Sequence, residues 1–153
     1  NPGTGKTTVA RIYGRILYGL GLLHTDKVVE ADRAKLVGEH IGETAQKVKM
    51  IVQSALDGVL FIDEAYSLGN PEGRDSFAKE CLDTLNQALT EQKSEFICII
   101  AGYKKDTERR FFEKNPGLKR RFAYTFNIDK YLPEELFMIL KRKIELMSKR
   151  LLA

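Results

Sequence analysis

Residues 1–8 of the chain read NPGTGKTT. This stretch matches the phosphate-binding pattern G-x-x-x-x-G-K-[ST] at its last fixed positions, Gly5, Lys6 and Thr7, while the first glycine of the pattern would precede Asn1. Glycines allow successive backbone N–H groups to point into one cavity, and the helix that begins near Gly5 adds its positive dipole end. The stretch therefore predicts a phosphate site where a loop enters a helix, and not only a glycine-rich turn.

The side chains of this loop predict its chemistry. Lys6 brings a positive charge to the β and γ phosphates of a nucleotide, and the Thr7 hydroxyl is a ligand for Mg²⁺. We therefore expect ATP and Mg²⁺ as cofactors. The predicted nucleotide-binding residues are Asn1, Pro2, Gly3, Thr4, Gly5, Lys6, Thr7 and Thr8.

A second motif, VLFIDE at Val59–Glu64, supports the first. Four apolar residues followed by two acids are typical of a buried strand that delivers carboxylates to its C-terminal end, where ligands bind in open α/β sheets. Asp63 is the predicted Mg²⁺ ligand, through water, and Glu64 the predicted general base that orients the attacking water. Alone the stretch could be a strand end with two solvated acids; together the motifs predict nucleotide hydrolysis.

Strands and helices alternate along the rest of the chain, which predicts an α/β fold with a mainly parallel sheet. The alternation stops near Tyr131–Pro133, where a long basic amphipathic helix begins. The expected strands are Lys27–Glu30, Val59–Ile62, Phe96–Ala101 and Tyr124–Ile128. The expected helices are residues 5–22, 45–56, 77–89, 107–113 and 133–151.

The composition of the 153-residue chain narrows the class of protein. An excess of 25 Lys and Arg over 21 Asp and Glu gives a net charge of +4, which is too small by itself to indicate nucleic acid. The basic clusters at 109–121 and 141–150 are either solvated helix faces or a phosphate- or partner-facing patch. Cys81 and Cys98 lack metal-ligand spacing, which favours buried thiols in the cytoplasm or another reducing compartment. No apolar run is long enough to predict a membrane span.

The order of motifs resembles that of AAA+ ATPases, most closely the group that contains red-type Rubisco activase and the stage V sporulation protein K. The resemblance rests on NPGTGKTTVAR, LVGEHIGETA, GVLFIDEAYSL, IIAGYK and NPGLKRRF. It implies a P-loop NTPase three-layer sandwich with the start of a helical lid. It also implies a Mg²⁺-dependent ATPase in a ring-shaped, usually hexameric, homo-oligomer that remodels or threads other proteins.

The resemblance assigns further roles by residue. Arg121 matches the arginine finger that acts in trans on a neighbouring subunit, with Lys119 and Arg120 as adjacent candidates. Tyr103 and Lys104 are the candidates for the sensor-1 position. His40, Ile41 and Gly42 match the pore loop that grips substrate polypeptide, although relatives usually have an aromatic residue where His40 stands. The alternative for LVGEHIGET is a structural loop with an exposed histidine.

The resemblance also implies two domains. Residues 1–131 would form the nucleotide-binding core and residues 132–153 the first helix of an incomplete lid, whose second sensor arginine is not in this sequence. The central first strand of the sheet would lie upstream of Asn1, so we expect the chain to be a fragment of a longer protein. Without that strand, the strand expected at Tyr124–Ile128 would lose its neighbour.

Two other functions use the same ATPase core and stay open at this point. One is a DNA-associated loader or helicase-type ATPase, which DNA would stimulate with steep salt dependence. The other is a nucleotide-gated assembly scaffold, in which binding drives assembly and hydrolysis is incidental.

Overall fold

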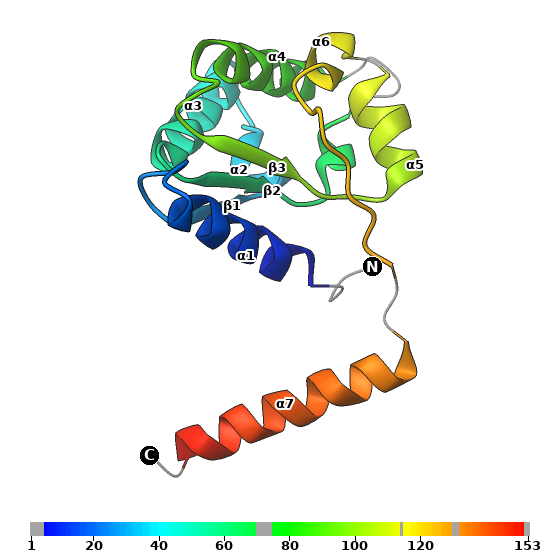
Figure 1. The fold of residues 1–153 in the computed structure, drawn as a ribbon. Helices are drawn as coiled ribbons and strands as arrows, with labels where there is room; N and C mark the ends of the chain where they lie inside the picture. The colour runs from blue at the N-terminus through cyan, green and yellow to red at the C-terminus, as the bar shows by residue number, and fades with distance from the viewer. Residues whose placement is uncertain (1–4, 70–74, 114, 130–131, 152–153) are drawn as a thin grey trace. The chain divides into compact units, whose positions relative to one another are not determined.

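The computed structural model describes residues 5–69, 75–113, 115–129 and 132–151, with side chains up to 147. The chain divides into two units, one of Gly5–Thr125 and one whose described part begins at Phe126 (Figure 1). The predicted phosphate-loop residues Asn1, Pro2, Gly3 and Thr4 lie outside the described residues.

Three parallel strands form the sheet of the first unit, in the order β1 (Val28–Ala31), β2 (Val59–Ile62) and β3 (Ile97–Ile100). Val59 in the central strand is level with Val28 on one side and Ile97 on the other. All four residues of β2 are buried, as their continuous apolar run predicts. The predicted α/β fold with a parallel sheet is confirmed, and each of these strands lies within one residue of its predicted bounds.

Helices cover both faces of the sheet (Figure 1). On one face α1 (Lys6–Gly19) packs Leu17 against Val59 of β2. On the other face α3 (Glu43–Ala55) and α4 (Ser76–Glu91) enclose the main core with Leu60 and Ile62. Successive side chains of β2 thus pack into opposite layers, because side chains of a strand alternate between the two faces of its sheet.

Close contact between α1 and the sheet depends on Gly14. A Cβ atom at Gly14 would stand 3.3 Å from a methyl of Val59 and 3.5 Å from a methyl of Val28. The small residue lets the helix lie directly on the strands, and this contact fixes the N-terminal end of α1 with respect to the end of β2.

Five short elements connect the main ones. They are α2 (Arg33–Leu36), the 3₁₀ helix η1 (Ala65–Leu68), α5 (Lys104–Asp106), the π-helical segment η2 (Thr107–Phe112) and α6 (Pro116–Lys119). The pattern predicted only the helical segment at 107–113, and the structure gives it π geometry. Phe111 of η2 is fully buried and meets Phe112 and Phe122 edge-on, so this segment is anchored by aromatic packing.

The predicted strand at Tyr124–Ile128 is wrong. Residues 122–129 are irregular, and Tyr124 and Phe126 are 82% and 76% exposed. The physical reason is pairing: among the described residues, β3 hydrogen-bonds only to β2, so no neighbouring strand satisfies the backbone of this segment. An aromatic, alternating sequence does not form a strand without such a partner.

The second unit contains α7 (Pro133–Leu151), which begins where the sequence predicts. Pro133 occupies the first turn, and the Glu135 carboxylate accepts a hydrogen bond from the Leu132 backbone N–H at 2.8 Å. Throughout the described part of the chain, no helix combines the length and the apolar character that crossing a membrane requires.

Candidate functional site

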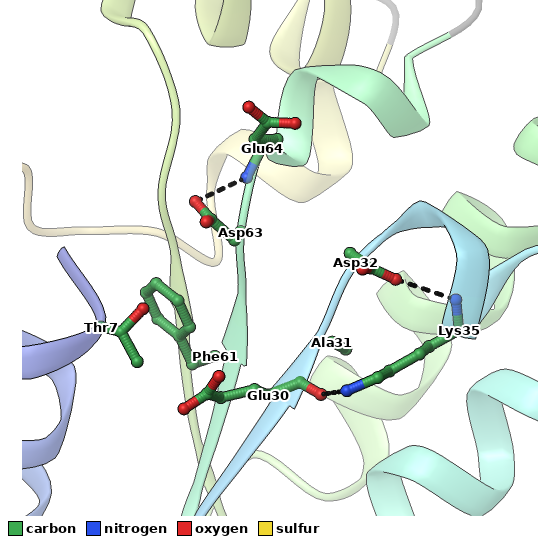
Figure 2. Close-up of a pocket in the computed structure, with 8 residues that line it drawn as sticks. All are labelled: Thr7, Glu30, Ala31, Asp32, Lys35, Phe61, Asp63 and Glu64. Carbon is green, nitrogen blue, oxygen red and sulfur yellow. Dashed lines mark hydrogen bonds between the residues drawn. The ribbon is translucent and has the colours of Figure 1, made fainter. Parts of the chain in front are cut away.

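A pocket of about 200 Å³ opens at the C-terminal ends of β1 and β2, beside the N-terminal turn of α1 (Figure 2). This is the edge of a parallel sheet at which ligands of open α/β folds bind. Its lining consists of Thr7, Glu30, Ala31, Asp32, Lys35, Phe61, Asp63 and Glu64. The pocket therefore joins one residue of the first motif to both acids of the second.

Strand β2 places the two acids by fixed backbone contacts. The Asp63 N–H donates to the Ala31 carbonyl at 2.9 Å, and the Ala65 N–H donates to the Ala101 carbonyl at 3.0 Å. Between these anchors Glu64 adopts a left-handed conformation (φ 50°, ψ 44°) as the cap of η1, and its N–H donates to Asp63 Oδ1 at 2.9 Å. A left-handed backbone is uncommon outside glycine, so the surrounding contacts hold this turn in place.

The two motifs meet in an ion pair. Lys6 Nζ lies 3.2 Å from Asp63 Oδ1, and the two side chains are 19% and 42% exposed. Gly5, just before Lys6, has φ 78° and caps α1, a conformation that glycine adopts without strain. The start of α1 and the end of β2 thus bring a cation and a carboxylate together. Both groups are predicted to act on a nucleotide.

Two tyrosines form a wall beside this pair. The Tyr103 ring centroid lies 6.0 Å from Lys6 Nζ and 5.8 Å from the Tyr66 ring centroid. Burial raises the pKa of Tyr66 above its ordinary value, and the nearby Glu64 carboxylate raises that pKa further. Tyr66 was missed by the sequence reasoning, although it stands in the quoted IDEAYSL stretch.

The pocket residues at the end of β1 and in α2 are held by contacts with Arg11 and with one another. Arg11 of α1 forms an ion pair with Glu30, and Lys35 Nζ donates to the Glu30 carbonyl at 2.9 Å. Asp32 caps α2 by accepting from the Lys35 N–H at 3.0 Å. Asp63 therefore remains the acid of the pocket that faces Lys6.

The donor set around Asp63 and Thr7 suits Mg²⁺. This ion prefers oxygen ligands and is usually held by one or two carboxylates, with water and substrate phosphates completing its shell. Within the described ranges, no three His, Cys, Asp or Glu side chains gather into a complete metal cage. A site for Mg²⁺ bound together with a phosphate chain fits these residues better than a site for a permanently held metal.

Other predicted residues lie away from this pocket's lining. Lys104 is exposed on α5, and Tyr103, the other sensor-1 candidate, is 42% exposed but has its ring beside Lys6. Arg121 is exposed just after α6, where its N–H donates to the Leu118 carbonyl at 2.9 Å. Of its alternatives, Lys119 forms an ion pair with Glu108, and Arg120 is exposed at the end of α6.

The predicted pore loop is a compact turn. Ile41 at its tip is 96% exposed, and Gly42 has φ 82° as the cap of α3. The Glu43 carboxylate accepts hydrogen bonds from the N–H groups of Glu39 and His40, at 2.7 and 3.2 Å. These bonds lower the pKa of Glu43 below its ordinary value.

The amino-acid sequence is similar to those of several known proteins over nearly the whole chain. Stage V sporulation protein K of Bacillus subtilis (strain 168) is 45% identical over 145 residues, which are 95% of this chain and 44% of that protein. The chloroplastic ribulose bisphosphate carboxylase/oxygenase activase of Cyanidioschyzon merolae is 45% identical over 139 residues, 91% of this chain and 47% of the relative. The ESX-3 secretion system protein EccA3 of Mycolicibacterium smegmatis is 44% identical over 144 residues, 94% of this chain and 24% of the relative.

The chain thus spans less than half the length of each of these relatives. The model of the ATPase family associated with various cellular activities (AAA) matches residues 1–129, a range that holds both motifs and the whole pocket. Family membership supports ATPase activity. The chain belongs to the AAA family of ATPases.

Proposed function

We propose that the protein hydrolyses ATP with Mg²⁺ and couples hydrolysis to the remodelling or threading of a protein partner, within a ring-shaped homo-oligomer. The observation that carries the proposal is the Lys6–Asp63 ion pair at 3.2 Å, which joins the phosphate loop to the acidic strand end beside a pocket. A ring of six copies is the assembly that the family resemblance implies.

Each residue at the site has one task in this proposal. Lys6 neutralises the β and γ phosphates, and the N-terminal turn of α1 adds its dipole. Thr7 and Asp63 hold Mg²⁺, which supplies charge neutralisation at the phosphates. Glu64 orients and polarises the attacking water as general base. Tyr103 is the better placed sensor-1 candidate, because its ring centroid lies 6.0 Å from Lys6 Nζ.

Arg121 completes the site from a neighbouring copy. Its exposure after α6 leaves the guanidinium available at the surface of the first unit. An arginine finger supplied in trans accelerates phosphoryl transfer by about 10³- to 10⁵-fold. In this proposal hydrolysis therefore requires assembly, and an isolated copy is nearly inactive.

The loop of His40, Ile41 and Gly42 contacts the protein partner. An almost fully exposed isoleucine at the tip of a hydrogen-bonded turn presents an apolar contact to a polypeptide. Two relatives carry names that refer to other proteins, an activase of ribulose bisphosphate carboxylase/oxygenase and a secretion-system component. These names support a protein partner for this chain, without identifying it.

The test measures phosphate release by the full-length protein with ATP, in Mg²⁺ or in EDTA. We expect Mg²⁺-dependent turnover that an unfolded protein such as casein stimulates. Stimulation by DNA alone, lost steeply as salt rises, would instead favour the loader or helicase-type function. Absence of turnover under every condition would contradict the proposal.

The role of Arg121 is tested by mixing subunits. Arg121→Ala and Glu64→Gln should each abolish turnover alone, and mixed rings should regain it because the Glu64→Gln copy offers its arginine to a neighbour with an intact base. Arg120→Ala is the matched control and should retain turnover. If Arg121→Ala assembles and keeps its biological function but does not hydrolyse ATP, the nucleotide-gated assembly scaffold is the better account.

A further inference from the structure

The loop of Glu39–Gly42 is tied to the first residue of α3. One oxygen of the Glu43 carboxylate, Oε2, accepts hydrogen bonds from the Glu39 N–H at 2.7 Å and from the His40 N–H at 3.2 Å. The Glu43 N–H in turn donates to the His40 carbonyl at 3.2 Å. A single residue therefore holds the backbone of this loop through both N–H and carbonyl groups.

The Glu43 carboxylate is itself held in place. Its second oxygen, Oε1, lies 3.3 Å from Lys47 Nζ, which also donates to the Val37 carbonyl at 3.4 Å. Gly38 leaves room for the carboxylate, because a Cβ atom there would lie 2.7 Å from Glu43 Cβ and 2.8 Å from Oε2. The Gly38 N–H donates to Thr44 Oγ1 at 2.9 Å, and Thr44 is fully buried. The base of the loop is thus joined to the packed face of α3.

The tip of the same loop is free of such packing. The Ile41 side chain is 96% exposed. Gly42 has φ 82°, a conformation that glycine adopts without strain, and a Cβ atom there would meet no described residue within 4 Å beyond its chain neighbours. The loop therefore combines a backbone fixed at its base with an apolar side chain presented at its tip.

We propose that Glu43 is a positioning residue for Ile41, which holds the loop of Glu39–Gly42 in the shape in which Ile41 binds the protein partner. The inference rests on the proposed function of this loop as the contact for a polypeptide. A loop that is ordered before binding loses little conformational entropy when the partner binds, so it binds more tightly than an unordered loop with the same side chains. The effect depends on where the Glu43 carboxylate accepts its hydrogen bonds, and not on its charge alone.

Stimulation of the full-length ATPase by casein, an unfolded protein, tests the proposal. Glu43→Ala removes the acceptor for both N–H groups, so the loop is ordered for only part of the time and the apparent affinity falls by that fraction. We expect the casein concentration that gives half-maximal stimulation to rise by about three- to tenfold. The maximal stimulated rate should stay that of the wild type, because saturating casein selects the ordered loop. A general disturbance of the fold would lower the maximal rate instead.

Matched variants separate position from charge. Glu39→Ala removes an equal charge from an exposed position of the same loop but keeps the backbone N–H, so its half-maximal casein concentration should be that of the wild type. Glu43→Gln keeps a side-chain oxygen that can accept from these N–H groups and should retain most of the affinity. Gly38→Ala places a Cβ where the Glu43 side chain lies and should act as Glu43→Ala does. Gly19→Ala, where a Cβ would meet nothing within 4 Å, is its control.

A double-mutant cycle tests whether Glu43 acts through Ile41. Ile41→Ala removes the apolar contact itself. If Glu43 positions this contact, Glu43→Ala should change the half-maximal casein concentration much less in the Ile41→Ala background than in the wild type. Circular dichroism and thermal unfolding verify that each variant is folded.

Each outcome bears on one claim. A weaker response to casein in Glu43→Ala and Gly38→Ala, retained in Glu43→Gln and lost as a separate effect beside Ile41→Ala, supports positioning. An unchanged half-maximal concentration in Glu43→Ala, or an equal rise in Glu43→Ala and Glu39→Ala, overturns it while the ATPase proposal stands. If casein does not stimulate the wild-type protein, the failure belongs to the proposed function, and the positioning of Ile41 falls with it.

Discussion

Lys6 Nζ and Asp63 Oδ1 lie 3.2 Å apart, although 57 positions separate the two residues in the chain. The pair forms because α1 lies directly on the sheet through Gly14, so its first turn ends beside the C-terminal end of β2. The arrangement joins the cation that we propose binds phosphate to the carboxylate that we propose holds Mg²⁺.

Removal of the Lys6 ammonium should weaken nucleotide binding. A hydrogen bond between charged groups contributes about 1.5–3 kcal/mol, so Lys6→Ala should lower the affinity for ATP by about 10- to 100-fold. Binding of a fluorescent ATP analogue measures the change. Lys49→Ala, at an exposed position of α3, is the control and should bind as the wild type does. Equal affinities for the Lys6→Ala and wild-type proteins would show that Lys6 does not contact phosphate.

Asp75 should stabilise the fold through its contacts with α4 and with Arg33. Its carboxylate accepts from the Ala78 N–H at 2.9 Å, which caps α4, and it pairs with Arg33. Asp75→Ala should lower the free energy of unfolding by about 2 kcal/mol, of which the cap contributes about 1 kcal/mol. Asp75→Asn keeps a side chain that can cap the helix, so its free energy of unfolding should fall by less than that of Asp75→Ala. Urea unfolding measures the stability of both variants, and Asp83→Ala, at an exposed position of α4, is the control. If Asp83→Ala lowers the free energy of unfolding as much as Asp75→Ala does, the stabilising role of the Asp75 contacts is refuted.

Glu43 should make the loop of Glu39–Gly42 sensitive to acid. Backbone N–H groups of Glu39 and His40 lower the pKa of Glu43 relative to the unfolded chain. A lowered folded-state pKa stabilises the loop above the ordinary pKa of 4.5, and this stabilisation is lost as the pH falls through the folded-state value. Glu43→Ala should remove hydrogen-exchange protection from both amides at neutral pH, whereas the exposed Glu39→Ala should not. If the Glu39 and His40 amides stay protected from hydrogen exchange in Glu43→Ala, the Glu43 carboxylate does not hold this loop.

Cys81 should be inert in the folded protein. Burial raises the pKa of Cys81 from 9.0 to about 12, which lowers the thiolate fraction at pH 8 by about a thousandfold. In a Cys98→Ser protein, Ellman's reagent should therefore label Cys81 at an ordinary rate only after unfolding. Labelling of the native protein at the rate of a small free thiol would show that this part of the α4 core opens readily.

The elements with strong local signals were predictable. The run at Val59–Ile62 predicts the buried strand without error because apolar residues on both faces suit a central parallel strand. The strand predicted from the alternating sequence at Tyr124–Ile128 is not formed, because a strand is completed by a partner that the local sequence does not specify. The π geometry of η2 likewise could not be read from periodicity, which predicts only a helical segment at 107–113.

The site was predictable where chemistry depends on residue type and spacing. Lys6, Thr7, Asp63 and Glu64 could be named because phosphate loops and acidic strand ends have fixed patterns. Tyr66 could not, since its position depends on the left-handed turn at Glu64 and on the close approach of Gly102. A preference for Tyr103 over Lys104 also needed the fold, which brings the Tyr103 ring beside Lys6.

The account depends most on Glu64 as the general base of a Mg²⁺-dependent ATPase. The direct measurement is a comparison of Glu64→Gln with the wild-type full-length protein, with bound nucleotide identified after rapid gel filtration and assembly followed by native mass measurement. We expect Glu64→Gln to bind ATP, to retain it uncleaved, and to remain assembled while the wild type releases ADP. A Glu64→Gln protein that converts ATP to ADP as fast as the wild type would contradict the account.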